Sequence, residues 1–251
     1  SWELSWLKER INARTITIKR MVDHGKIIDL ILDHFPKPFG LIDYDCFVFN
    51  KSFFENIKKI PDQTLTNSVF HWHDEMLNID IPGTYFMFLN PKEINKIRGE
   101  YRSNCRTAYY CQLSNKIKNQ LSILGMNNNG RLMNNHSIFD TMHVVVALGI
   151  SQGKSINFLE QYNNESQRFE DIIHIGSVST PNKINSMYSL RGSLFWRKAL
   201  EAHPSGELRQ HYYKLFGEKT SEELIREHPE RYKRISQDFL NTIDRLIKSS
   251  Y

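Results

Sequence analysis

The chain has three cysteines, eight prolines and no long apolar run among its 251 residues. No apolar segment approaches the roughly 20 residues that are needed to cross a bilayer, so we expect no membrane-spanning helix and no membrane partner. The opening segment, SWELSWLKERINAR, is charged and amphipathic and does not contain the apolar core of a signal peptide. We therefore expect a soluble protein.

The cysteines argue against a disulfide scaffold. Cys46, Cys105 and Cys111 form no CxxC motif, and an odd number leaves one thiol unpaired in any disulfide scheme. Disulfides are rare in reducing compartments, so the cytoplasm is the simplest location. Because 40% of the residues are hydrophobic, the chain can form one large domain or two of ordinary size, and disorder is not expected.

Positive charge is in excess and is unevenly distributed. The net charge of +5 and the pI near 9.0 are compatible with nucleic-acid binding without requiring it. Seven Lys or Arg residues lie between Lys92 and Lys118, against two glutamates, and a second basic stretch runs from Lys183 to Lys198 with no acidic residue. Either stretch could face phosphate groups, and the alternative for each is a solvated helix face.

Helix signals are clear near the N-terminus. Residues 1–22 have the pattern of an amphipathic helix with Trp2 and Trp6 on one side, which favours docking onto a core or a partner chain. Asp23 is then placed to cap a second helix, and Pro36 marks where that helix must have stopped.

The segment from His34 to Ile57 is the most interpretable part of the sequence. Its β-favouring residues surround Asp43-Tyr44-Asp45, which we interpret as the turn of a short hairpin, and Asn50 stands where the N-cap of a following helix belongs. This order resembles the opening of PAS sensor domains. The resemblance implies a module for dimerisation or ligand sensing, with Phe39, Phe47, Phe49, Phe53 and Phe54 filling a core rather than lining a cofactor pocket.

The next segments extend this interpretation. Asn90-Pro91-Lys92-Glu93 predicts a helix start with an Asn N-cap, Pro at the first position and Glu closing a capping box, and the helix should run to about Tyr101. This segment also resembles PAS domains. Residues 107–113 and 119–125 alternate enough to predict strands, and the turn Asn127 to Gly130 follows them.

The predicted fold class is α+β, with a PAS-like α/β N-terminal half and a mainly helical C-terminal half. The Asn- and Gly-rich segment from Gly125 to His136 is the expected boundary. The predicted units are the N-terminal helix 1–22, a PAS-like sensor or dimerisation domain 23–128 and a helical, possibly DNA-binding domain 136–251. The last helix carries an apolar stripe formed by Tyr232, Ile235, Phe239, Ile243, Leu246 and Ile247.

A DNA-binding element is suggested within residues 141–183. Val144 to Ser151, followed by Leu159, Ile173 and the Val178-Ser179 pair, resembles the LuxR-type helix-turn-helix. The resemblance implies a bacterial DNA-binding transcriptional regulator, an oligomeric activator with no catalytic residues. An ordinary helical subdomain is the alternative.

The expected DNA contacts lie mostly outside the recognition helix of that motif, because residues 165–175 carry three acidic side chains that would repel phosphate. Double-stranded DNA and a second copy of the chain are the expected partners, and no small-molecule ligand can be named. The predicted DNA-binding residues are Lys183, Arg191, Arg197, Lys198, Asn182, Lys154 and Arg168.

Two cofactor patterns are incomplete. His71 and His73 would point the same way on a strand and could bind Zn²⁺, but no third ligand is fixed by spacing. The segment from Gly149 to Ser155 is rich in the residues of a phosphate-binding loop, but its glycine spacing is wrong for a P-loop. We therefore expect neither a metal nor a nucleotide cofactor.

Two further functions stay open as alternatives. Arg168 and His174 resemble the paired residues of HEPN ribonucleases, in which Arg stabilises charge on the phosphate and His moves a proton. The other alternative is a non-enzymatic interaction protein whose basic patches meet acidic protein surfaces.

Overall fold

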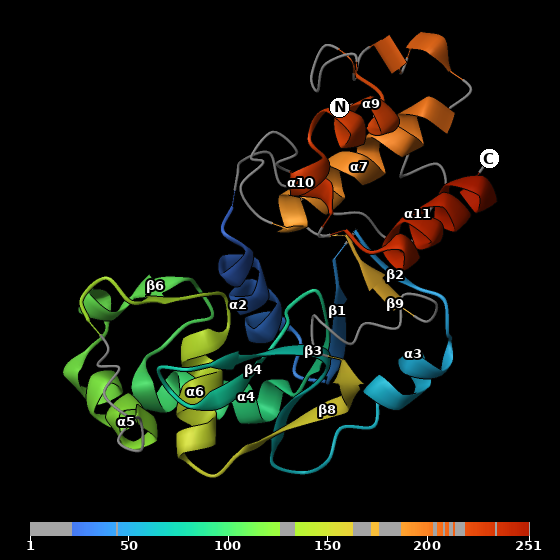
Figure 1. Ribbon diagram of the computed structural model, residues 1–251. Coiled ribbons are helices and arrows are strands. Elements are labelled where there is room, and N and C mark those ends of the chain that lie inside the picture. The colour runs from blue at the N-terminus through green and yellow to red at the C-terminus, as the bar shows by residue number, and fades with distance from the viewer. Residues whose placement is uncertain are drawn as a thin grey trace.

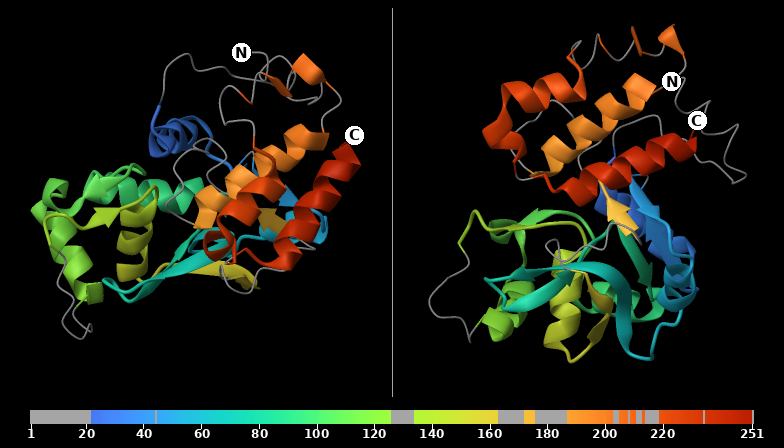
Figure 2. Two further views of the ribbon diagram at one scale, coloured as in Figure 1. Left: turned by 45° about the horizontal axis from the view of Figure 1, so that its top comes forward. Right: turned by 45° about the vertical axis from the view of Figure 1, so that its right-hand side comes forward.

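The computed structural model describes residues 22–43, 45–125, 134–162, 172–175, 187–202, 219–233 and 235–250, with a few positions between 205 and 213. The described part mixes helices and strands, which confirms the predicted α+β class. One region is a sheet with its covering helices, and the other is a group of C-terminal helices (Figure 1). The two views in Figure 2 show the same two regions.

The main sheet is built around one long strand, β3 (Thr64–Asp74). β4 and β5 pair with it antiparallel, β8 pairs with it parallel, and β1 extends the sheet beyond β5. The bounds of these strands are β1 (Phe39–Ile42), β4 (Ile79–Pro82), β5 (Phe86–Leu89) and β8 (Ser155–Tyr162).

Two short ribbons accompany the main sheet. β2 (Cys46–Val48) pairs antiparallel with β9 (Ile172–His174), and this ribbon lies beside the C-terminal helices (Figure 1). β6 (Ala108–Tyr109) pairs antiparallel with β7 (Ile138–Phe139), and the 3-10 helix Tyr110–Gln112 follows β6.

The helices fall into two groups in the chain. Those that accompany the sheet are α2 (His24–His34), α3 (Ser52–Ile57), α4 (Pro91–Tyr101), α5 (Asn115–Gly125) and α6 (His143–Ser151). The C-terminal group contains α7 (Met187–Ala202), α9 (Ser221–Glu227), α10 (Pro229–Tyr232) and α11 (Gln237–Ser250).

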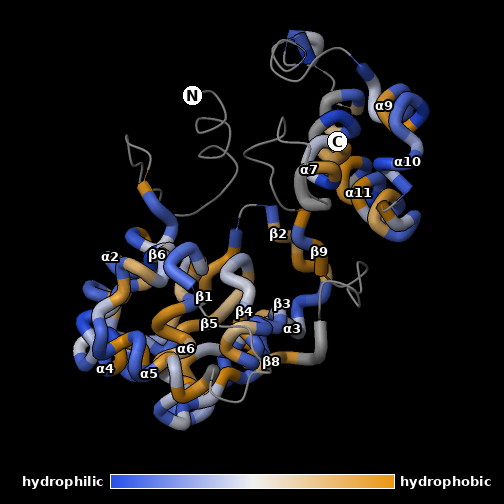
Figure 3. The backbone as a smooth tube through the Cα atoms, turned by 60° about the vertical axis from the view of Figure 1, so that its left-hand side comes forward, coloured by the Kyte–Doolittle hydropathy of each residue, from blue (hydrophilic) through white to orange (hydrophobic). Residues whose placement is uncertain are grey.

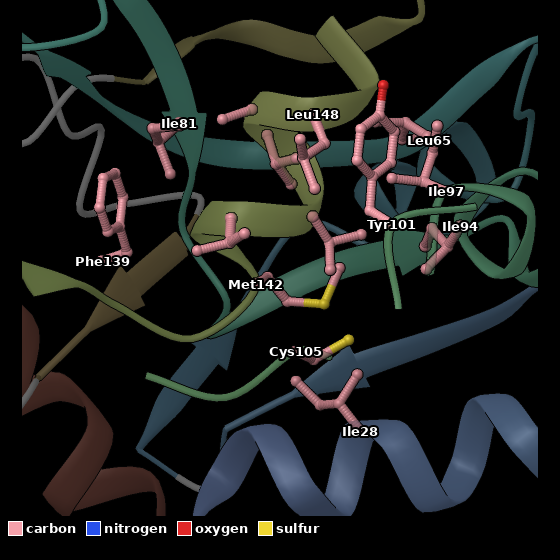
Figure 4. Packing of buried hydrophobic residues seen from close by; sticks show 14 of the residues in the cluster. Ile28, Leu65, Ile81, Ile94, Ile97, Tyr101, Cys105, Phe139, Met142 and Leu148 are labelled. Atoms are coloured by element: carbon pink, nitrogen blue, oxygen red, sulfur yellow. The ribbon is translucent and has the colours of Figure 1, made fainter. Parts of the chain in front are cut away.

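The largest core lies around α6. All residues from His143 to Gly149 are buried, as expected for a helix that is apolar on every side. They pack with residues of α2, α4, α5 and the sheet (Figure 4). Figure 3 shows apolar residues concentrated in the sheet and α6, with hydrophilic residues on α4 and α5. This core therefore extends past the expected boundary at 125–136.

The C-terminal helices form a second core that includes part of β9. Ile173 and Ile175 pack with Leu194 of α7 and with Phe239 and Ile243 of α11. The apolar stripe predicted for the last helix is thus buried within the chain, and it does not by itself call for a partner chain. The Trp2 and Trp6 segment lies outside the described residues.

Several local predictions are confirmed. The Asp23 carboxylate accepts a hydrogen bond from Lys26 N at 3.2 Å, and α2 ends at His34, before Pro36. Asn50 Oδ1 accepts from Ser52 N, but the N-cap position of α3 is Lys51, one residue later than predicted. α4 begins at Pro91 as expected, but the Asn90 side chain makes no capping hydrogen bond and donates to Thr64 O instead.

Three predicted pairings or elements are wrong. β1 and β2 do not form a hairpin, because β1 pairs with β5 and β2 pairs with β9. Residues 119–125 belong to helix α5 rather than to a strand. Leu159 lies in strand β8, where the helix-turn-helix pattern required a helix. The PAS-like arrangement predicted for the N-terminal half is not confirmed.

Among the described residues, none of the helices combines the length and the apolar character that a bilayer crossing requires.

Candidate metal centre

Asp43 and Asp45 lie in the short connection between β1 and β2. Because these strands pair in different sheets, the connection joins the edge of the main sheet to the β2–β9 ribbon. Its backbone is held at both ends: Asp43 N donates to Tyr85 O at 2.8 Å, and Cys46 N donates to Asp43 O at 3.0 Å. These bonds fix the positions from which the two carboxylates project.

His174 comes from a distant segment of the chain and lies next to these two carboxylates. It is the last residue of β9 and lies opposite Cys46 in the ribbon. The next residue completes the contact, because Ile175 N donates to Asp45 O at 3.0 Å. His174 Nε2 lies 3.4 Å from Asp45 Oδ1. One potential ligand atom from each of Asp43, Asp45 and His174 falls within 4.8 Å of the other two.

The three side chains differ in exposure. Asp45 and His174 are buried, with 6% and 8% relative exposure, whereas the Asp43 side chain is 36% exposed. Burial raises the pKa of Asp43, and the neighbouring Asp45 carboxylate adds to this shift. His24, whose Nε2 lies 4.0 Å from Asp43 Oδ1, and His174 oppose it. Two carboxylates this close favour a bound cation, since a positive charge relieves their repulsion.

Aromatic rings support the imidazole. The Tyr85 ring stacks on His174, with centroids 3.7 Å apart and an interplanar angle of 10°. Phe70 packs against Tyr85 with centroids 4.7 Å apart. Both residues belong to or flank strands of the main sheet, so the sheet buttresses the ribbon at this point.

The neighbouring thiol does not belong to the ligand set. Cys46 is buried in a core cluster with Ile57, Phe70 and Phe86. Burial raises the pKa of the Cys46 thiol, and the charges of Asp45 and Asp43 raise it further, so the thiol stays protonated. Two carboxylates and one imidazole without thiolate favour Mn²⁺ or Mg²⁺ over a structural Zn²⁺ site.

The predicted DNA-binding residues of α7 are engaged within the protein. The guanidinium of Arg191 lies over the Phe239 ring, 5.1 Å from its centroid, and the residue is buried. Arg197 donates to the carbonyl of Lys219, and burial lowers its pKa. Lys198 Nζ lies 2.8 Å from Asp244 Oδ1. These cations join α7 to the other C-terminal helices.

The other predicted DNA contact among the described residues, Lys154, also forms an ion pair within the protein. Lys154 Nζ pairs with the buried carboxylate of Glu93 at 2.8 Å, on the other side of the main core. Asn182, Lys183 and Arg168 lie outside the described residues. The end of the expected recognition helix, residues 172–174, is strand β9.

The two histidines considered for Zn²⁺, His71 and His73, contact different residues. His73 Nδ1 lies 3.0 Å from the exposed Asp80, whereas the His71 ring packs against Phe158. His174, the proton-transfer residue of the ribonuclease alternative, lies beside Asp43 and Asp45, whereas its proposed partner Arg168 lies outside the described residues. The D-x-D spacing directly after a strand could have indicated the two carboxylates, but we interpreted these residues as a turn. Nothing near them in the sequence points to His174.

The comparisons with known proteins give one match. Residues 1–94 match a family model described as the StrH glycosyltransferase N-terminal domain, which is less than half of the chain. No curated protein and no solved structure matches. The match overturns the predicted membership among PAS and LuxR-type regulators, and with it the predicted role of a DNA-binding transcriptional activator. The matched segment contains Asp43 and Asp45 but not His174.

Proposed function

We propose that the chain carries the divalent-cation site of a glycosyltransferase, at which Asp43, Asp45 and His174 hold Mn²⁺ or Mg²⁺ against the phosphate groups of an activated sugar donor. The observation that carries this proposal is the approach of the three ligand atoms to within 4.8 Å. The family match supports the reaction class, and it includes both carboxylates.

The chemistry of glycosyl transfer suits such a site. The bond between the anomeric carbon and the leaving group breaks as the oxygen of an acceptor hydroxyl forms a new bond to that carbon. A phosphate or diphosphate leaves with the bonding electrons, and the hydroxyl proton passes to the leaving group or to solvent. A bound divalent cation would supply stabilisation of that negative charge. Mg²⁺ is commonly held by one or two carboxylates together with substrate phosphates, which matches a small protein ligand set.

The three residues have different roles in this proposal. Asp45 and His174 are buried and held by the β2–β9 ribbon, so they anchor the cation. Asp43 is partly exposed and lies on the side open to solvent, where a donor would arrive. The chain would then act as an enzyme, in place of the non-catalytic role expected from the sequence. Three free cysteines are consistent with the expected cytoplasmic location.

The test is metal binding by isothermal titration with Mn²⁺ and Mg²⁺. Asp45→Asn and His174→Ala should each weaken Mn²⁺ binding by about 10-fold or more, since each removes a ligand. Asp80→Asn is the matched control and should bind like the wild type. Asp80 and His73 form an exposed Asp–His pair that belongs to no group of three potential metal ligands among the described residues.

A second measurement addresses the donor. A panel of nucleoside diphosphates should bind the wild-type chain in Mn²⁺ and lose that binding when EDTA is added. Failure of the wild type to bind either cation would end the proposal, as would equal losses in Asp45→Asn and Asp80→Asn. Metal-independent binding of the nucleotides would remove the link between cation and donor.

A further inference from the structure

We propose that Tyr85 is a positioning residue for the metal centre, which sets the orientation of the His174 imidazole through ring stacking. This inference rests on the proposed function, since it assigns His174 to the cation. Tyr85 itself is not offered as a ligand.

The stacking geometry restricts the imidazole without using its nitrogens. The two rings are nearly parallel, at 10°, with centroids 3.7 Å apart. Coordination to a metal uses a lone pair in the plane of the imidazole, whereas stacking occupies a face of the ring. Tyr85 therefore limits rotation of the His174 side chain by contacting its face, while Nε2 on the ring edge lies 3.4 Å from Asp45 Oδ1.

The Tyr85 ring also packs against a second aromatic ring, that of Phe70. Phe70 is fully buried in β3 and contacts the Tyr85 ring, with centroids 4.7 Å apart. Gly83 makes room for this arrangement: a Cβ at Gly83 would lie 2.8 Å from Tyr85 Cζ and 3.0 Å from Phe70 Cβ. A side chain at position 83 would push the tyrosine ring out of place, so glycine permits the stack.

Tyr85 also contacts the carboxylate segment through its backbone. Its carbonyl accepts the hydrogen bond from Asp43 N at 2.8 Å. One residue of the main sheet thus holds the Asp43 backbone through its carbonyl and the His174 ring through its side chain. This placement links ligands that come from distant parts of the sequence.

Outer groups that orient a metal-binding histidine typically contribute 10- to 100-fold to metal affinity. We therefore expect Tyr85→Leu to weaken Mn²⁺ binding about 10-fold. Tyr85→Phe retains the aromatic face and should bind within about twofold of the wild type. Phe35→Leu, which changes an exposed aromatic residue of the same chain, is the matched control and should have no effect.

A double-variant cycle separates positioning from general loosening of the fold. If Tyr85 acts through His174, the Tyr85→Leu/His174→Ala variant should bind Mn²⁺ no more weakly than His174→Ala alone. Gly83→Ala should weaken binding in the same non-additive way. The nitrogen coupling in the electron paramagnetic resonance spectrum of bound Mn²⁺ should be lost in His174→Ala, reduced in Tyr85→Leu and unchanged in Tyr85→Phe.

The outcomes distinguish this inference from the proposed function. Additive losses in the double variant, or equal losses in Tyr85→Phe and Tyr85→Leu, would overturn the positioning role while Asp45→Asn still showed that the metal centre exists. If Asp45→Asn had no effect on Mn²⁺ binding, the proposed metal centre itself would be wrong.

Discussion

Asp74 is a buried carboxylate whose ionisation is coupled to the stability of the fold. Burial alone would raise its pKa, but hydrogen bonding with His143, 2.9 Å away, and with the backbone N–H groups of Leu77 and Met76 outweighs burial and lowers it. A lowered carboxyl pKa contributes stability that is present above the pKa of the unfolded chain, near 4, and is lost as the pH falls through the folded value.

Asp74→Asn should therefore lower the free energy of unfolding by about 2 kcal/mol at pH 7, because hydrogen bonds to an ionised acceptor are replaced by weaker ones. The difference from wild type should shrink as the pH falls below about 4. Urea unfolding at pH 7 and pH 3 measures both quantities. An equal loss at the two pH values would show that ionisation of Asp74 is not the cause.

Asp43 carries a shift of the opposite sign. Because burial raises its pKa, its contribution to stability is fully present below the unfolded pKa and is lost as the pH rises through the folded value. The metal-free protein thus bears a cost at neutral pH for keeping this carboxylate charged.

Removing that charge should stabilise the metal-free chain. Asp43→Asn should raise the melting temperature at pH 7 in EDTA by about 1 to 2 °C, a small effect because the side chain is partly solvated. In Mn²⁺ the order should reverse, since the wild type gains binding energy that the variant lacks. Differential scanning fluorimetry in both buffers tests this, and a less stable Asp43→Asn protein in EDTA would contradict it.

At the scale of elements, the β2–β9 ribbon is the part of the fold that a bound cation should change most. His174 ends β9, Asp45 immediately precedes β2, and Ile175 N donates to Asp45 O beside the ribbon. Local opening of the ribbon separates the ligands, so cation binding opposes opening.

Mn²⁺ at 100 times its dissociation constant should slow amide exchange of Ile175 and of β2 by about 100-fold. The amides of α4, which belongs to the main core and supplies no ligand, should exchange at an unchanged rate. Hydrogen-exchange mass spectrometry of the wild type and Asp45→Asn gives the comparison. Protection of α4 to the same degree would indicate a global effect instead.

Single elements were more predictable than their pairing. The Asp23 cap, the helix start at Pro91 and the apolar stripe of α11 are local signals, and each marked a helix that exists. Strand pairing depends on segments far apart in sequence. Asp43-Tyr44-Asp45 indicated a turn. These residues cannot specify that the strand before the turn, β1, pairs with β5, or that the strand after it, β2, pairs with β9.

The metal centre was hidden for the same reason. Asp43 and Asp45 lie between two predicted strands, where aspartate is common in turns, so no metal was needed to explain their presence. His174 becomes the third ligand only because β9 pairs with β2, and that pairing leaves no local pattern in the sequence. The turn could therefore be predicted from the sequence, whereas the proposed metal site at that turn could not.

For the whole molecule, the positive net charge proved a poor guide to function. Described cations that suggested a phosphate-binding surface bind within the protein: Lys154 to Glu93, Lys198 to Asp244 and Arg191 against Phe239. A cation that is committed to joining helices is not available for a counterion-release contact with nucleic acid. The net charge counts all charged residues, whereas nucleic-acid binding depends on which Lys and Arg side chains can reach a phosphate.

The separation of the ligands along the chain also sets an order for biosynthesis. Asp43 and Asp45 leave the ribosome before His174, and the elements from β3 to β8 are made in between. The nascent chain can therefore bury α6 and complete the β3–β8 pairing before it can bind a cation in the arrangement described above. Metal loading would come late in the maturation of this protein, as a step that reports successful assembly of β9 onto β2.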